Sequence, residues 1–218
     1  MKSDSATTGL SRKRFFLIKG PLEQNKPVVE AIAQQPLVSR DCYYTRAGAS
    51  KAFIKWLGEN DCESVYCREI RPDDVEGPNA VPEFINAVST GEKEFGNREL
   101  ARKWLAVNLP ETLRKGFYEL RQNQLQTTIK QAETLSGAPV LSVMTDRNGT
   151  AYFTDLELGT YTLSNIVPTE FGTAGLVWNC EVQVKPGDLA TEKPFLISNR
   201  KDKNVKCVAV ERPLPKCE

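Results

Sequence analysis

TDRNGTAYFTDLELGTYTLSN, residues Thr145–Asn165, is the stretch of sequence that decides the fold. Its Asn148-Gly149 pair supplies the positive φ of a tight turn, and Asp146 can accept hydrogen bonds from backbone N–H groups there. Gly159 marks a second break. Between the breaks, Thr and aromatic residues alternate as in a β-strand. The stretch therefore predicts a β-hairpin, with Asp146, Asn148, Gly149 and Gly159 at its turns.

The chain after Gly137 consists of short runs rich in Val, Thr and aromatic residues, separated by turn residues. These runs are VLSVMTD, GTAYFTDL, GTYTLSNIV, GLVWNCEVQV, KPFLISN and NVKCVAVER. Six short strands with no helix between them predict an antiparallel β-sandwich, which we assign to residues 122–218.

The preceding residues have mostly helical patterns. A buried strand is expected at KRFFLIKG and an extended segment at PLVSRDCYYTR, with helices at NKPVVEAIAQQ, GASKAFIKWLGEN, AVPEFINAVSTGE, NRELARKWLAV and LPETLRKGFYELRQ. In the fourth helix Asn97 is the expected cap, with Leu100, Trp104 and Leu105 facing inward. The fold class is α+β: a flexible tail over residues 1–12, an α-rich domain over 13–121, and the β-sandwich.

The hairpin stretch resembles the signature of carboxypeptidase regulatory-like domains, which are transthyretin-like or Ig-like β-sandwiches. The matching positions are Thr145, Asp146, Gly149, Tyr152, Phe153, Leu156, Gly159, Tyr161 and Leu163. Leu158 stands where the family usually has proline. The resemblance implies a largely non-catalytic module of exported bacterial proteins, which acts as a spacer, a stability domain, or a binder of sugar or protein partners. No family resemblance is found for the α-rich part.

The resemblance also affects residues 121–136. Leu125, Ile129, Ala132 and Leu135 have the spacing of a helix, while Leu125, Thr127 and Ile129 also alternate as in a strand. Members of the family have a strand before the Thr-Asp turn. We therefore expect QLQTTIKQA to belong to the sheet, and we place the domain boundary at residue 122.

Composition excludes several functional classes. The chain of 218 residues contains no histidine, which removes Ser-His-Asp and Cys-His catalysis and imidazole metal sites. A net charge of +1 gives no indication of nucleic-acid binding, and the apolar runs are too short for a transmembrane segment. We expect no catalytic residue, cofactor or metal site.

The six cysteines favour disulfide bonds and an oxidising compartment, although buried free thiols in a cytosolic protein are the alternative. We expect Cys180 to pair with Cys207, Cys62 with Cys67, and Cys42 with Cys217. Three cysteines lie in each half, so complete pairing requires at least one bond between the halves. The N-terminus lacks the apolar region of a signal peptide, so we expect an exported protein to be present here in its mature form. The expected location is secreted or periplasmic, with anchoring at the cell surface as a further option.

Four other features have both functional and structural interpretations. Asp146, Asn148, Thr150 and Glu157 match part of a calcium loop, but Ala151 occupies the position that needs glycine. Asn148-Gly149-Thr150 is a glycosylation sequon in a eukaryotic host. An acidic cluster could bind calcium but is expected to be a solvated loop; it consists of Asp61, Glu63, Glu69, Asp73, Asp74 and Glu76. Four aromatic residues could stack on sugars but are expected to lie in the core; they are Tyr43, Tyr44, Tyr66 and Trp178.

The sequence thus predicts a non-catalytic exported bacterial protein that acts as a binding or structural module of the cell envelope. A protein or carbohydrate partner fits this prediction, and the oligomeric state is left open. The alternatives are a carboxylate-dependent enzyme acting on polysaccharide or peptidoglycan, and a subunit of an envelope assembly.

Overall fold

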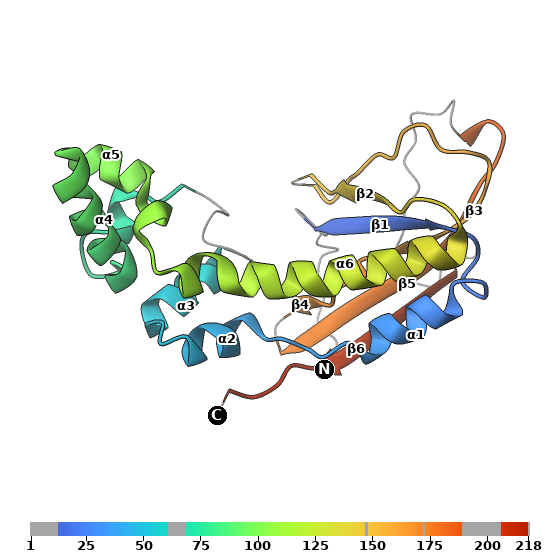
Figure 1. Ribbon diagram of the computed structural model, residues 1–218, viewed down its shortest axis with the longest axis horizontal. Coiled ribbons are helices and arrows are strands. Elements are labelled where there is room, and N and C mark those ends of the chain that lie inside the picture. The colour runs from blue at the N-terminus through green and yellow to red at the C-terminus, as the bar shows by residue number, and fades with distance from the viewer. Residues whose placement is uncertain (1–12, 61–68, 147, 172, 189–205, 218) are drawn as a thin grey trace. The chain divides into compact units, whose positions relative to one another are not determined.

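The computed structural model describes residues 13–60, 69–146, 148–171, 173–188 and 206–217 (Figure 1). The chain divides into two compact units. The sheet unit contains residues 1–37 and 124–214, and the helical unit contains residues 38–123 and 215–218. The predicted boundary at residue 122 lies close to the division between residues 123 and 124, whereas residues 13–37, which are predicted from the sequence to lie in the α-rich domain, belong to the sheet unit.

The sheet unit contains six antiparallel strands in one open sheet, so the α+β class is correct. The order is β2-β1-β3-β5-β4, with β6 also paired to β5. The strands are β1 (Arg14–Lys19), β2 (Leu141–Met144), β3 (Gly159–Ser164), β4 (Thr169–Phe171), β5 (Ala174–Val184) and β6 (Lys206–Pro213). Within the described residues no second sheet completes a sandwich, and KPFLISN lies outside them. The transthyretin-like fold therefore stays a prediction.

Strand β1 lies between β2 and β3. It pairs with β2 from Arg14↔Met144 onward and with β3 from Phe16↔Ser164 onward. The predicted hairpin over 145–165 is consequently wrong, because β2 and β3 do not pair with each other and residues 151–158 form no strand. The physical reason is burial: β1 is an apolar run that can bury both faces, as a central strand must, whereas residues 151–158 are mostly exposed.

Strands β3 and β4 are two parts of one interrupted strand along β5. Residues 179–181 of β5 pair with β3 on one edge and β6 on the other, and residues 174–176 pair with β4 and β6 in the same way. The interruption at residues 165–168 includes Ile166, whose φ is 55°. This bulge removes ladder hydrogen bonds from the middle of the sheet.

The side chain of Asn165 replaces those bonds. Its Nδ2 donates to the carbonyl oxygens of Val167 at 3.1 Å and Leu176 at 2.9 Å, and to Thr169 Oγ1 at 3.1 Å. Its Oδ1 accepts a hydrogen bond from the backbone N of Trp178 at 2.9 Å. Asn165 is 3% exposed, so it acts as a buried polar bridge between the bulge and β5.

Two helices cover one face of the sheet (Figure 1): α1 (Lys26–Gln34) and the C-terminal part of α6 (Phe117–Ser136). Buried Val28 and Ile32 of α1 pack with Phe16 and Ile18 of β1, and Ala132 of α6 joins the same cluster. The predicted strand QLQTTIKQA is therefore wrong. It is helical because the spacing of Leu125, Ile129 and Ala132 puts all three on the side that faces this cluster.

The opposite face of the sheet is covered by the loop that follows the Asp146 turn. Phe153 and Leu156 of this loop pack against the cluster formed by Leu17, Tyr161, Leu163, Cys180 and Val184. Glu157 holds the loop, since its carboxylate accepts a hydrogen bond from Lys19 at 2.6 Å and its carbonyl accepts one from the Tyr161 hydroxyl at 2.9 Å. The Lys19 ammonium lowers the pKa of the Glu157 carboxyl by hydrogen bonding.

The helical unit is built around buried aromatic rings. Its elements are α2 (Arg40–Arg46), α3 (Lys51–Glu59), η1 (Pro72–Asp74), α4 (Pro82–Phe95), α5 (Arg98–Lys103), η2 (Leu105–Asn108), the π-helix η3 (Thr112–Gly116) and the start of α6. Phe84 contacts Phe53 and Trp56 edge to face, with ring centroids 5.5 and 4.9 Å apart. PLVSRDCYYTR was expected to be extended, but Ser39 caps α2 by accepting from Cys42 N, which allows the helix to form.

Candidate functional site

The Asp146 turn is a structural turn. The Asp146 carboxylate accepts hydrogen bonds from the backbone N of Asn148 at 2.8 Å and of Thr150 at 2.9 Å, and Gly149 has a φ of 79°. Gly159, with a φ of 144°, begins β3. In the described part of the chain, no group of three or more Cys, Asp or Glu side chains is arranged to hold a metal ion.

Two disulfide bonds join Cys42 to Cys217 and Cys180 to Cys207. These are two of the three pairs expected from the sequence, and Cys62 and Cys67 lie outside the described residues. Cys180 and Cys207 are directly opposite each other on β5 and β6. Cys42 and Cys217 are distant in sequence, but both lie in the helical unit.

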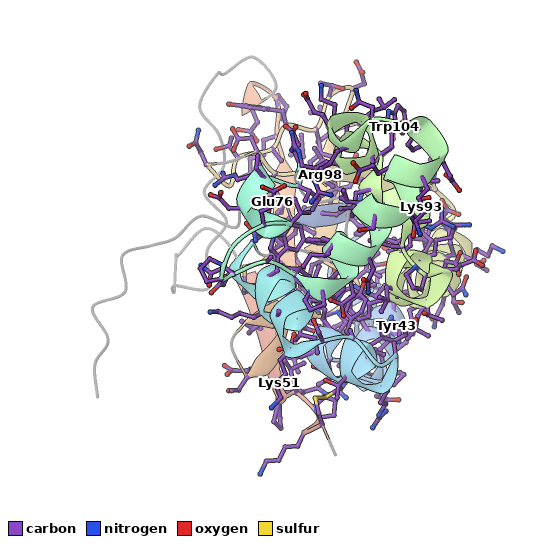
Figure 2. The ribbon with its side chains drawn as sticks, turned by 90° about the vertical axis from the view of Figure 1, so that its left-hand side faces the viewer. Tyr43, Lys51, Glu76, Lys93, Arg98 and Trp104 are labelled. Atoms are coloured by element: carbon purple, nitrogen blue, oxygen red, sulfur yellow. A yellow bond between two sulfur atoms is a disulfide. The ribbon has the colours of Figure 1, made fainter. Side chains whose placement is uncertain are left out.

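Two of the described acidic residues of the predicted cluster, Asp74 and Glu76, accept hydrogen bonds from neighbouring side chains. Asp74 accepts from Trp56 Nε1 at 2.9 Å, and Glu76 accepts from Arg98 Nε at 3.2 Å. Arg98 also donates to Glu92 at 3.1 Å, and these hydrogen bonds raise the pKa of its guanidinium. Arg98 lies beside Glu76 on the exposed side of the unit (Figure 2). Asp61 and Glu63 lie outside the described residues.

The aromatic pair Tyr43-Tyr44 supports the π-helix η3. The Tyr43 hydroxyl donates to the carbonyl oxygen of Thr112 at 3.2 Å, and the Tyr44 hydroxyl donates to that of Leu113 at 3.2 Å. A π-turn leaves carbonyl groups outside the regular helical pattern, so they need other donors. Tyr44 is 2% exposed and Tyr43 is half-buried. Neither ring is free to stack on a sugar; Trp178 is half-buried, and Tyr66 lies outside the described residues.

Gly116, at the end of η3, makes room for the Tyr43 hydroxyl. A Cβ atom at residue 116 would lie 1.9 Å from the Tyr43 oxygen. We expect Gly116→Ala to lower the free energy of unfolding by about 1–3 kcal/mol, despite alanine's higher helix propensity, because Tyr43 must move and lose its bond to Thr112. Urea denaturation measures the loss. The double variant Gly116→Ala/Tyr43→Phe lacks the clashing hydroxyl, and it should recover stability; failure to recover would contradict this explanation.

Tyr44 is also expected to make stability depend on alkaline pH. Burial raises the pKa of the Tyr44 phenol to about 12, above the value of about 10 in an unfolded chain. Between these pH values the unfolded state releases the proton and the folded state keeps it, so the stability contributed by Tyr44 is lost as pH rises from about 10 to about 12. The fall should be about 2 kcal/mol and should be absent in Tyr44→Phe. Thermal unfolding over this range tests it, with exposed Tyr152→Phe as the control that should retain the fall.

The most exposed large apolar side chains of the helical unit include Trp104, on the segment formed by α5 and η2. Trp104 is 58% exposed, Val107 56% and Leu100 41%. Trp104 lies between the end of α5 and the 3-10 helix η2. Its backbone N donates to the Leu100 carbonyl at 3.1 Å and its carbonyl accepts from Val107 N at 3.0 Å, so the three residues follow one another at one-turn intervals; we name them the Trp104 face. The expectation that Leu100 and Trp104 face inward is therefore wrong. The side that packs inward is formed by Ala101, Leu105 and Leu109.

α5, which precedes Trp104, also carries paired charges. Lys103 forms an ion pair with Glu99 at 3.3 Å, and Arg98 binds Glu92 and Glu76. Figure 2 labels Trp104 and Lys93 on this side of the unit, where Lys93 is exposed. The segment has two rows of apolar residues: residues 100, 104 and 107 in one, and residues 101, 105 and 109 in the other. It is therefore apolar on two sides, and one core cannot cover both. That double periodicity is the sequence signal that could have identified the surface.

None of the helices in the described ranges is both long enough and apolar enough to span a membrane. Comparison with known proteins finds no matching family model, no matching curated protein and no matching solved structure. Inference about function therefore rests on the chain's own residues, and above all on the Trp104 face.

Proposed function

We propose that this chain is a non-catalytic binding module whose Trp104 face docks on a protein partner. The observation that supports this most directly is the exposure of Trp104, Leu100 and Val107 on one side of α5 and η2. Large apolar side chains grouped on a surface are typical of interaction sites, and Trp is the residue most enriched among those that dominate binding energy.

The side chains around Trp104 favour a protein over a carbohydrate. A sugar needs polar groups that are free to bind its hydroxyls, whereas Leu100 and Val107 are aliphatic and Lys103 is already paired with Glu99. An aromatic anchor within an aliphatic patch and a polar rim is the usual composition of a protein interface. The partner that fits is a protein with an apolar pocket that accepts an indole ring.

The contacts of the acidic residues support a non-catalytic role over a carboxylate-dependent enzyme. A glycosidase needs two carboxyl groups facing one substrate. Here the carboxylates of Asp74 and Glu76 accept hydrogen bonds from Trp56 and Arg98, which commits them to the structure of the unit. The resemblance of residues 145–163 to carboxypeptidase regulatory-like domains favours a scaffold role for the sheet unit.

The two disulfide bonds support an extracellular or periplasmic location, because such bonds persist in oxidising compartments. A binding or structural module of a bacterial cell envelope agrees with this. If the partner stays permanently bound, the chain would be a subunit of a larger envelope assembly.

Substitution of Trp104 tests the proposal. A photo-crosslinking amino acid in place of Lys103, next to the face, would first identify the protein bound in the native compartment. The purified partner should then bind the wild-type chain, and Trp104→Ala should weaken the dissociation constant by at least about 30-fold, as expected for a dominant interface residue. Calorimetry gives both values.

The matched control is Tyr118→Ala, which removes another ring, 57% exposed, from the same unit. It should leave the dissociation constant unchanged. Equal binding by Trp104→Ala and wild type would disprove docking at this face. Binding of a soluble polysaccharide that Trp104→Ala abolishes would instead assign the surface to carbohydrate.

A further inference from the structure

The last described residues of the chain are fastened to α2 by one covalent bond. Cys217 is bonded to Cys42, and Cys42 Sγ lies 3.2 Å from the carbonyl oxygen of Pro215. Within the described ranges, no hydrogen bond or ion pair of Lys216 or Cys217 adds to this attachment. The segment 215–217 is therefore held by the disulfide, and we name it the C-terminal strap.

The two described disulfides differ in their access to solvent. Cys217 is exposed, whereas its partner Cys42 is 4% exposed. In the other bond, Cys180 is 1% exposed and Cys207 is half-buried, and both pack in the cluster on the loop-covered face of the sheet, so neither sulfur belongs to a fully exposed residue. Thiol–disulfide exchange requires a thiolate to reach one of the two sulfur atoms, so access determines which bond reacts first.

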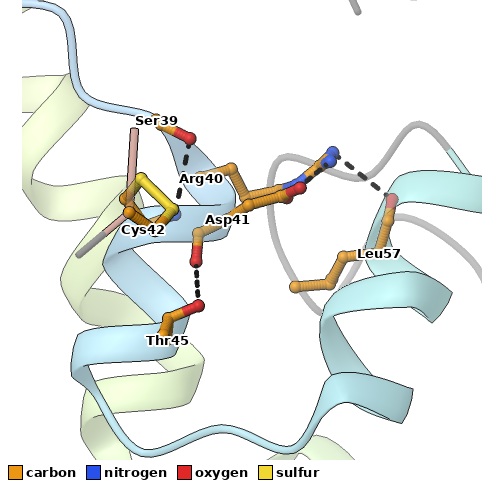
Figure 3. A network of polar contacts seen from close by, with 7 residues as sticks. Ser39, Arg40, Asp41, Cys42, Thr45 and Leu57 are labelled. Atoms are coloured by element: carbon orange, nitrogen blue, oxygen red, sulfur yellow. Dashed lines mark hydrogen bonds and ion pairs between the residues drawn. A yellow bond between two sulfur atoms is a disulfide. The ribbon is translucent and has the colours of Figure 1, made fainter. Parts of the chain in front are cut away.

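Helix α2 has contacts of its own that do not depend on the strap. Ser39 Oγ accepts from Cys42 N at 3.4 Å, Thr45 Oγ1 donates to the Asp41 carbonyl at 2.8 Å, and Arg40 donates to the carbonyl of Leu57 in α3 at 3.4 Å (Figure 3). Loss of the Cys42–Cys217 bond would consequently leave α2 in place. It would release the strap and uncover Cys42.

We propose that the Cys42–Cys217 bond is a redox-sensitive switch, which a dithiol reductant opens while the Cys180–Cys207 bond stays closed. A thiolate of the reductant attacks Cys217 Sγ, forming a mixed disulfide and releasing Cys42 as a thiolate that takes up a proton. The second thiol of the reductant then displaces Cys217, which leaves as a thiolate. The reductant becomes a disulfide, and its two electrons reduce the two protein cysteines.

Graded reduction with dithiothreitol, followed by alkylation and peptide mass spectrometry, tests the order of opening. Cys42 and Cys217 should be alkylated with a rate constant at least about tenfold higher than that of Cys180 and Cys207. Equal rates, or faster reaction of Cys180 and Cys207, would overturn the proposal.

Hydrogen exchange on the partly reduced protein tests the consequence. Exchange should rise at Lys216 and Cys217, while α2, β5 and β6 keep their protection because their own hydrogen bonds remain. Cys217→Ser should show the same exchange pattern without reductant. If the variant instead exchanges like the oxidised wild type, the bond does not hold the strap. If that variant does not fold, partly reduced wild type still decides between the outcomes.

Discussion

Replacement of Asn165 by alanine is expected to lower the free energy of unfolding by about 3 kcal/mol. The variant loses the carboxamide that binds the carbonyl of Leu176 and the backbone N of Trp178 across the bulge. Both groups belong to β5 in the middle of the sheet. Alanine cannot bond to them, and an unpaired buried backbone group costs about 1–3 kcal/mol.

Urea denaturation of the variant measures this loss. Asn86→Ala is the matched control, because Asn86 is exposed on α4 and its replacement should change stability by less than about 0.5 kcal/mol. A loss below about 1 kcal/mol for Asn165→Ala would mean that the bulge finds other donors and acceptors, and that the bridge is not needed.

Combined replacement of Leu17 and Ile18 in β1 should unfold the sheet unit. Leu17 is 4% exposed and packs on the loop-covered face, whereas Ile18 is 0% exposed and packs under α1 and α6. Each substitution by alanine is expected to cost about 2–5 kcal/mol. Because the two side chains belong to different clusters, the losses should add, and their sum approaches the whole stability of a typical domain, about 5–15 kcal/mol.

Circular dichroism and denaturation of the single and double variants test this expectation. Arg14→Ala, on the same strand but exposed, is the control and should remain close to wild type. A double variant no less stable than the weaker single variant would contradict the assignment of β1 as a central strand buried on both faces.

The local elements of the fold could be predicted well from the sequence. Asn97 accepts a hydrogen bond from the first turn of α5, as the cap expected from the sequence, and α3 lies within the predicted segment GASKAFIKWLGEN. The sequence also placed β1, β3, β5 and β6, because β-branched and aromatic runs between turn residues are a local property.

Strand pairing could not be predicted in the same way. The neighbours of β1 lie more than 120 residues away in the sequence, so no local pattern identifies them. The family resemblance centred on Gly149 and Gly159 predicts a hairpin. For residues 124–132 it predicts a strand, whereas hydrophobic periodicity predicts a helix. The structure has a helix here, because helical spacing lets Leu125 and Ile129 pack together on the sheet.

The candidate site was missed because a single apolar stripe was assumed. Leu100, Trp104 and Leu105 were all assigned to the inner side of one helix. The segment has two apolar rows, one with Leu100 and Trp104 and one with Ala101 and Leu105, and only one row can pack in the core. The row that is buried contains Ala101 and Leu105, which are smaller than Trp104. The exposed indole ring is visible only once the packing of α4 against α5 is known.

The insertion of β1 between β2 and β3 also has a consequence for protein synthesis. The ribosome completes Phe16 126 residues before its partner Ser142 and 148 residues before its partner Ser164, which at 5–20 residues per second are delays of roughly 6–25 s and roughly 7–30 s. Residues 38–123, the main part of the helical unit, are made within both intervals. Until β2 has been made, the nascent chain therefore carries β1, with Phe16, Leu17 and Ile18, as an apolar segment that has no pairing strand.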